Sequence, residues 1–159
     1  MFKFKRGRFC AVGELEKYQV GSSEVFFYFK NGIEMVVGNV PENIGMMLRT
    51  LNLSNMRNAL VVIPLPGMKS DAQIKMNNDD SKLDNIEDGE TTLVFHDLEV
   101  KGRLKYFNGG TQTSYFPFFA EIEISYPNMP EDMLHSVKSI RLDTLKNSKI
   151  DFTQKRVFV

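Results

Sequence analysis

The chain has 159 residues and a mass of 18.3 kDa, which is the size of one ordinary globular domain. Its 20 Lys and Arg residues balance 20 Asp and Glu residues, so the formal net charge is zero. This balance excludes a uniformly basic nucleic-acid tail and a polyanionic solvating chain. The hydrophobic share of 42% excludes a disordered composition, and it contains 13 Phe and 9 Met but no Trp.

The cysteine content and the apolar runs bear on the compartment. Cys10 is the single cysteine, so no intrachain disulfide can form, which favours a reducing environment. The basic N-terminus is followed by only a short apolar stretch at 9–12, too short for a signal peptide. The longest apolar run, 59–65, is far below the ~20 residues of a spanning helix. We therefore expect a cytoplasmic protein.

Alternating apolar residues predict a hairpin between Glu24 and Val37, with a type I′ turn at Asn31-Gly32. Because residues 25–29 are apolar on both faces, we expect this strand to be covered on each side and to lie centrally in its sheet. The next element is a short helix over Pro41–Leu51, since apolar residues recur there with helical spacing. Its apolar face consists of Ile44, Met47, Leu48 and Leu51.

Two short strands are predicted next, at 59–65 and 72–76, the first ended by Pro64 and the Pro66-Gly67 turn. Residues 77–90 hold six acidic side chains against one lysine and few apolar positions. This composition predicts a solvated, mobile loop.

The remaining segments also indicate mainly β-structure. A strand pair is predicted at 91–100 and 103–107 around Lys101-Gly102, then one long strand at 113–126, a helical turn at 130–135, and strands at 139–142 and 150–159. No repeat with a period of 20 to 50 residues occurs, which argues against solenoids and propellers. The sequence therefore predicts a single mainly β domain (β-rich α+β) over residues 1–159. We expect a β-barrel or β-sandwich of about nine strands with one or two short helices.

Catalytic and metal-binding patterns are weak. A Cys–His nucleophile would need Cys10 with His96 or His135, but Cys10 lies in an apolar strand segment where free cysteine is usually buried. Zinc and calcium ligand spacings and phosphate-binding glycine loops do not occur. Glu121 and Glu123 are two residues apart, a spacing more typical of a solvated strand face than of an acid–base pair. We thus predict no catalytic residue, no cofactor and no metal.

Charged residues cluster along the chain in spite of the neutral total. Residues 1–8 carry a net +4, residues 79–90 a net −5 and residues 138–159 a net +4. Basic residues near aromatic ones are typical of single-strand nucleic-acid binders. The candidate anion contacts are Lys3, Lys5, Arg6, Arg8, Lys155 and Arg156. The candidate interaction loop contains Asp79, Asp80, Asp84, Glu87 and Asp88.

The function expected from these observations is non-enzymatic binding or assembly through a protein–protein surface, with a protein partner or a second copy of the chain. One alternative is a single-stranded nucleic-acid-binding barrel, which would use the basic residues named above. A further alternative is a small-ligand barrel or an enzyme with a dispersed site.

Overall fold

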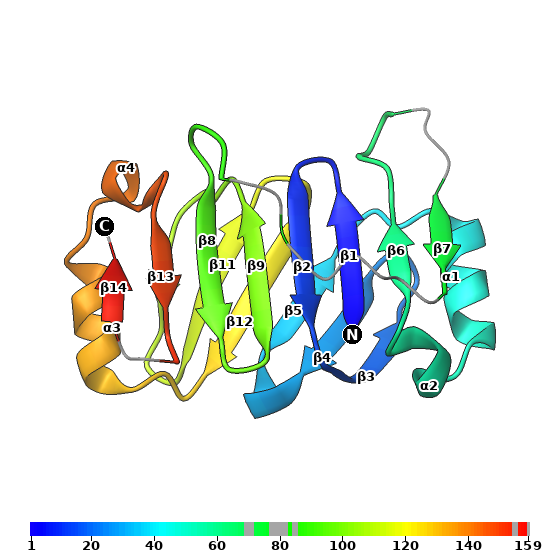
Figure 1. Cartoon of the computed structure of the whole chain (residues 1–159), viewed down its shortest axis with the longest axis horizontal. Helices are drawn as coiled ribbons and strands as arrows, with labels where there is room; N and C mark the ends of the chain where they lie inside the picture. Colours follow the sequence, from blue (N-terminus) through cyan, green and yellow to red (C-terminus); the bar gives the residue numbers. More distant parts are fainter. Residues whose placement is uncertain (69–71, 77–82, 84–85, 154–155, 159) are drawn as a thin grey trace.

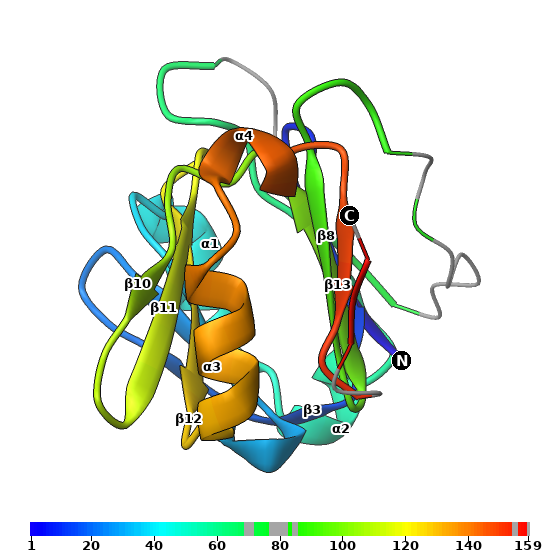
Figure 2. The same cartoon turned by 90° about the vertical axis from the view of Figure 1, so that its left-hand side faces the viewer.

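The computed structural model describes residues 1–68, 72–76, 83, 86–153 and 156–158. In this part of the chain, two open sheets form a sandwich-like arrangement (Figures 1 and 2). The predicted mainly β α+β class is confirmed. The barrel alternative is wrong, because neither sheet closes on itself: each ends in two different edge strands.

The larger sheet, sheet A, is mixed and has the strand order β14-β13-β8-β9-β2-β1-β6-β7. Its neighbours are antiparallel except for the parallel pairs β1–β6 and β8–β13. Its strands are β1 (Phe2–Arg6), β2 (Phe9–Gly13), β6 (Leu60–Val62), β7 (Gln73–Lys75), β8 (Thr91–Phe95), β9 (Leu98–Gly102), β13 (Lys149–Asp151) and β14 (Arg156–Phe158).

The smaller sheet, sheet B, is antiparallel, with the order β10-β11-β12-β5-β4-β3. Its strands are β3 (Leu15–Val20), β4 (Val25–Phe29), β5 (Glu34–Val37), β10 (Asn108–Gly109), β11 (Thr113–Phe118) and β12 (Ile122–Pro127). The helices are the 3₁₀ turn η1 (Lys30–Gly32) and the α-helices α1 (Glu42–Thr50), α2 (Leu53–Met56), α3 (Glu131–Lys138) and α4 (Leu142–Leu145).

The core lies between the two sheets. Alternate residues of each strand point inward, so that Phe2 and Phe4 of β1 contact Phe27 of β4 at ring-centroid distances of 4.9 and 5.9 Å. The helices lie at the two ends of the molecule, α1 and α2 at one end and α3 and α4 at the other (Figure 1). Many of the phenylalanine side chains thus belong to the core. Because the described helices lie at the ends, they do not cover the outer faces of the two sheets.

The element order repeats within the chain. A hairpin (β1–β2), three strands (β3–β5), two helices (α1, α2) and two strands (β6, β7) are followed by the same series, β8–β9, β10–β12, α3, α4, β13 and β14. Parallel pairing recurs in each series, as β1–β6 and as β8–β13. We call residues 2–75 the N-terminal half and residues 91–158 the C-terminal half.

The same repeat is present in the sequence at an offset of 89 positions. Between positions 27 and 42, seven residues recur unchanged 89 positions later, far above chance for unrelated segments. The recurring pairs are Phe27/Phe116, Phe29/Phe118, Ile33/Ile122, Glu34/Glu123, Asn39/Asn128, Pro41/Pro130 and Glu42/Glu131. This period lies outside the 20 to 50 residues that define solenoid repeats, so the chain contains a tandem duplication of a larger unit.

The two halves are related by a pseudo-two-fold axis. In sheet A, Ala11 lies opposite Val100, and in sheet B, Met35 lies opposite Ile124. Each of these pairs joins equivalent positions of the two halves. The axis of the rotation that exchanges the halves therefore passes between the two residues of each pair. Strands β2 and β9, and strands β5 and β12, therefore join the halves through continuous sheets.

Several predicted elements are confirmed. The hairpin at 24–37 forms as β4 and β5, but its turn is the η1 helix, in which Gly32 has a φ of +76°, and not a type I′ turn. The helix at 41–51 forms as α1, although Met47 is 46% exposed. The strands at 59–65 and 72–76 and the helical turn at 130–135 also form, as β6, β7 and α3.

Other predictions are wrong in ways that reflect local turns. The strand at 25–29 has one buried and one half-exposed face. The turn placed at Lys101-Gly102 lies at His96-Asp97, between β8 and β9. The single strand at 113–126 is a hairpin, because Ala120 and Glu121 adopt φ values of +78° and +59°. The strand predicted at 139–142 does not form, because this segment leads into the helix α4 at residues 142–145. The described residues contain fourteen strands instead of nine.

No helix in the described part of the chain is long and apolar enough to cross a membrane.

Candidate interaction face

The described helices leave the outward-facing side of sheet B open (Figure 2). On a pleated strand, the residues between the core positions point to this side. We call these residues the outer face: Lys17, Gln19, Phe26, Tyr28, Glu34, Val36, Tyr115, Pro117, Glu123 and Ser125. They come from five adjacent strands of both halves, so the pseudo-two-fold axis passes through the middle of the face.

Apolar and aromatic groups flank the centre of the outer face. Phe26, Tyr28 and Val36 are half-buried, and Tyr115 is 37% exposed. The ammonium group of Lys17 lies over the Tyr28 ring, 4.8 Å from its centre, and makes a cation–π contact with it. Aromatic rings that keep part of their surface in water are typical of protein contact surfaces.

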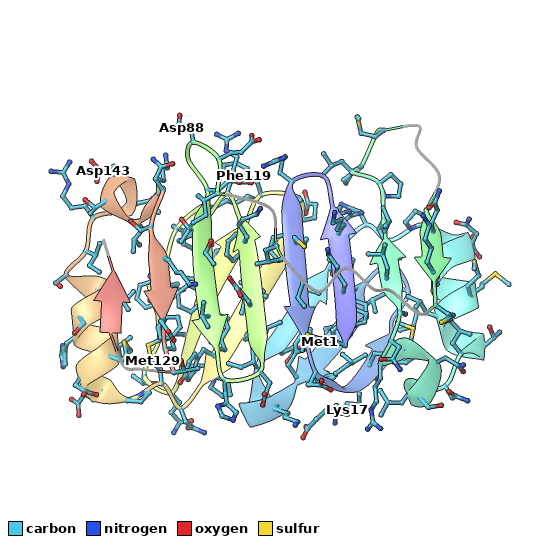
Figure 3. The ribbon with its side chains drawn as sticks, in the orientation of Figure 1. Met1, Lys17, Asp88, Phe119, Met129 and Asp143 are labelled. Atoms are coloured by element: carbon cyan, nitrogen blue, oxygen red, sulfur yellow. The ribbon has the colours of Figure 1, made fainter. Side chains whose placement is uncertain are left out.

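A further exposed aromatic ring lies just beyond the end of β11. Phe119 is 49% exposed and lies between two cations, with the Arg103 guanidinium at 5.3 Å and the Lys105 ammonium at 5.5 Å. Figure 3 shows Phe119 at the upper rim of the molecule and Lys17 at the lower rim. The exposed ring of Phe119 thus lies directly after β11, before the turn residues Ala120 and Glu121.

Two glutamates occupy the centre of the outer face. Glu34 of β5 lies opposite Ser125, and Glu123 of β12 lies opposite Val36, so the two carboxylates are diagonal neighbours across the axis. Burial raises the pKa of Glu34, and the nearby charge of Glu123 raises it further, whereas Lys17 lowers it. The centre of the face is thus an acidic spot whose charges repel each other.

A shallow depression adjoins this acidic spot. It has a volume of about 390 Å³, and the residues that line it include Glu24, Val36, Lys105, Tyr106, Glu121 and Glu123. Three of these are carboxylates and one is a lysine, so the depression continues the negative character of the centre. A cationic side chain placed there would meet carboxylates beside an apolar wall.

The predicted basic contacts do not form one exposed cluster. Lys3 and Arg6 are buried, Lys5 is half-buried, and Arg8 pairs with the carboxylates of Glu87 at 3.0 Å and Glu90 at 3.5 Å. Lys155 lies outside the described residues, and only the backbone of Arg156 is described. The contact of these residues with an anion stays a prediction.

Arg6 is instead part of the interior. Its guanidinium donates hydrogen bonds to the backbone carbonyls of Pro64 (3.0 Å), Gly38 (2.5 Å), Asn39 (2.8 Å) and Ala120 (3.2 Å). Burial lowers the pKa of Arg6, and the charge of Glu121 opposes this effect. Sequence reasoning missed this role, because one arginine in a basic stretch carries no local sign of burial.

The predicted interaction loop is only partly described. Glu87 and Asp88 are exposed, and Glu87 binds Arg8. Asp79, Asp80 and Asp84 lie outside the described residues, as does most of the stretch for which we predicted mobility. Among the described residues, Glu87 thus joins this loop to the N-terminal basic stretch through its ion pair with Arg8.

Potential catalytic groups are dispersed. Cys10 is buried, as predicted, while His96 and His135 are exposed on different elements. Among the described residues, no three His, Cys, Asp or Glu side chains are arranged to hold a metal ion. Comparisons with protein-family models, with curated proteins and with solved structures found no significant match. The outer face of sheet B is therefore the candidate site that the geometry itself provides.

Proposed function

We propose that the chain is a non-enzymatic protein-binding domain that acts through the outer face of sheet B. The observation that carries this proposal is the open, pseudo-symmetric face in which aromatic and apolar groups surround Glu34 and Glu123. Interfaces commonly combine aromatic anchors with a few charges that fix the register.

Charge complementarity indicates the kind of partner. A protein surface that presents Lys or Arg between apolar side chains would neutralise the two carboxylates and cover Phe26 and Tyr28. A second copy on the same axis would bring four carboxylates together, which is unfavourable at neutral pH. We therefore infer a basic protein partner in preference to self-association through this face.

Nucleic-acid binding is the less favoured alternative. The guanidinium of Arg6 is occupied by four carbonyls and that of Arg8 by two carboxylates, so the predicted basic stretch offers few free cations. The outer face itself would repel phosphates, because its centre is acidic.

The proposal can be tested with a panel of peptides that alternate Arg or Lys with aromatic residues. Nuclear magnetic resonance titration of the full chain should show saturable shifts at Phe26, Tyr28 and Tyr115. The double variant Glu34→Lys, Glu123→Lys should weaken binding by at least tenfold. Peptides of the same length with Glu in place of the basic residues should not bind.

A matched control uses Glu42→Lys with Glu131→Lys, the exposed glutamates that occupy equivalent positions of α1 and α3. This control changes the net charge by the same amount and should leave the affinity unchanged. If both double variants lose affinity for the peptides equally, the loss comes from the changed net charge alone, and this result would contradict the proposal. Two other outcomes would also contradict the proposal. A dimer detected by light scattering that Tyr28→Ser dissociates would indicate self-association, and salt-sensitive oligonucleotide binding would indicate nucleic-acid binding.

A further inference from the structure

The buried site of Arg6 has an equivalent in the C-terminal half, and the residues that fill the two differ. At the offset of 89 positions, Arg6 corresponds to Phe95. The inward side chain at the end of β1 is thus a cation, whereas the one at the end of β8 is an aromatic ring. The two environments can be compared segment by segment.

The same segments surround both positions. The carbonyls that accept from Arg6 belong to Gly38, Asn39, Pro64 and, across the axis, Ala120. Their equivalents in the sequence are Pro127, Asn128, Thr153 and Asn31. One of these equivalents, Thr153, lines a pocket of about 240 Å³, together with Ile33, Phe95, His96, Tyr126, which precedes Pro127, and Phe152. The pocket is therefore the pseudo-symmetric counterpart of the guanidinium site.

Aromatic rings make up much of the pocket wall. Phe95 and Phe152 are stacked, with centroids 5.1 Å apart and planes 10° apart, and Tyr126 lies 5.4 Å from each. In the N-terminal half, the residues equivalent to Tyr126 and Phe152 are the aliphatic Val37 and Ile63. Ring faces attract cations, so the wall of the pocket is suited to a positive group, and none of the described residues that line it is a lysine or an arginine.

The mouth of the pocket carries ionisable groups. Nε2 of His96 lies 3.6 Å from a carboxylate oxygen of Asp97, and the ammonium of Lys30 lies 4.0 Å from the same oxygen. The carboxylate of Asp97 is thus placed close to the entrance. A small cation entering beside His96 would pass this negative charge, which the ammonium of Lys30 partly compensates.

We propose that this pocket binds a guanidinium or alkylammonium group from outside the chain. The ligand takes the place that the Arg6 guanidinium has in the other half, with aromatic rings in the wall beside it. This site is distinct from the outer face of sheet B, so the inference does not depend on the proposed protein partner.

The first test compares butylguanidinium with butylurea, which has nearly the same shape but no charge. Titration of the full chain, followed by nuclear magnetic resonance, should show saturable binding of butylguanidinium, with shifts at Phe95, Tyr126 and Phe152. Butylurea should bind at least about tenfold more weakly, the size of effect that a cation–π contact produces. Equal affinities, or no saturation by butylguanidinium at tens of millimolar, would overturn the proposal.

Variants locate the binding. Phe95→Arg supplies an internal guanidinium and should abolish saturable binding, while Tyr126→Ala should weaken it about tenfold even if the first variant does not fold. Met47→Ala, at an exposed position of α1 outside both candidate sites, is the control and should bind as the wild type does. Binding that survives in folded Phe95→Arg protein, or that Tyr126→Ala leaves unchanged, contradicts the assignment.

A third arm separates two sources of the same cation. N-acetyl-arginine methylamide carries peptide groups on both sides of an arginine, as in a protein. If it binds more tightly than butylguanidinium, the natural ligand is an arginine side chain of a polypeptide. If it binds more weakly, the ligand is a free small molecule.

Discussion

The two halves of the molecule share one chain path but differ at the position where β1 and β8 end. In the N-terminal half, Arg6 is buried and bonded to carbonyls, and in the C-terminal half, Phe95 stands beside a pocket. Core positions such as Phe27/Phe116 and Phe29/Phe118 have stayed the same, since they face the shared interior. A duplicated fold thus keeps its packing residues while equivalent interior sites acquire different chemistry.

Removing the guanidinium of Arg6 should have the largest effect on stability. Arg6→Ala leaves buried carbonyls without donors, so we expect the free energy of unfolding to fall by about 3–5 kcal/mol. Urea denaturation measures this loss. Arg8→Ala, which breaks half-exposed ion pairs, should change it by less than about 1 kcal/mol. Similar losses in the two variants would show that the interior role of Arg6 is wrongly assigned.

Gly13 of β2 and Gly102 of β9, which occupy equivalent positions of the two halves, should differ in their tolerance of a methyl group. A Cβ at Gly13 would lie 2.5 Å from the carbonyl oxygen of Asp97, whereas one at Gly102 would lie 2.7 Å from the edge of the Phe9 ring. A side chain can yield more easily than a backbone, so we expect losses of about 3 kcal/mol for Gly13→Ala and about 1 kcal/mol for Gly102→Ala. Thermal unfolding of both variants measures these losses of stability. A larger loss for Gly102→Ala than for Gly13→Ala would contradict the prediction.

The asparagines before α1 and α3 should behave alike. Asn39 and Asn128 have φ values of +51° and +54°, a backbone region that asparagine and glycine tolerate. Replacement by alanine should lower the free energy of unfolding by about 1 kcal/mol at each position, and replacement by glycine should restore most of it. A loss confined to one half would mean that the two turns are held by different contacts.

The smallest expected effect concerns the acidic pair. Because the folded protein raises the pKa of Glu34, it binds a proton there more readily than the unfolded chain does. Stability therefore falls as the pH rises through this pKa. Glu34→Gln should raise the free energy of unfolding at pH 7 by less than about 1 kcal/mol, since solvent screens the exposed part of the group. The gain should vanish below about pH 4, where the carboxyl is also protonated in the unfolded chain.

Replacing its neighbour tests the cause of this shift. Glu123→Gln removes the repulsive charge, so the pKa of Glu34 should move down toward its ordinary value without reaching it, because burial remains. A carboxyl titration by nuclear magnetic resonance measures this change. An unchanged pKa of Glu34 would show that the two carboxylates do not interact across the axis.

Local patterns in the sequence predicted the class of the fold and several elements, among them the hairpin at 24–37 and the helix that begins after Pro41. They failed where a turn uses residues without a glycine signal, as at Ala120 and Glu121, whose positive φ values are imposed by the pairing of β11 with β12. Comparing the sequence with itself at long offsets would have revealed the duplication, since Pro41-Glu42 returns as Pro130-Glu131.

The candidate sites were less accessible from the sequence. Basic residues near the N-terminus look alike in one dimension, but Arg6 points into the core while Arg8 reaches Glu87. The acidic pair of Glu34 and Glu123 joins positions 89 residues apart, so only the register of β5 with β12 shows that they are neighbours. Both the burial of Arg6 and the proximity of the two glutamates depend on pairing between strands that are distant in the sequence. Local composition gives no information about this pairing.

The edge strands of sheet B bear on the solubility of the protein. A sheet edge can recruit another chain and start aggregation, and short or charged edges prevent this. At one edge, β10 has only two residues, and at the other, β3 carries Glu16 and Lys17, while the Tyr18 hydroxyl donates to carbonyls at the end of α1. The sheet is thus protected against growth at both edges, so its aromatic outer face can stay open to water without the chain forming fibres through its strands.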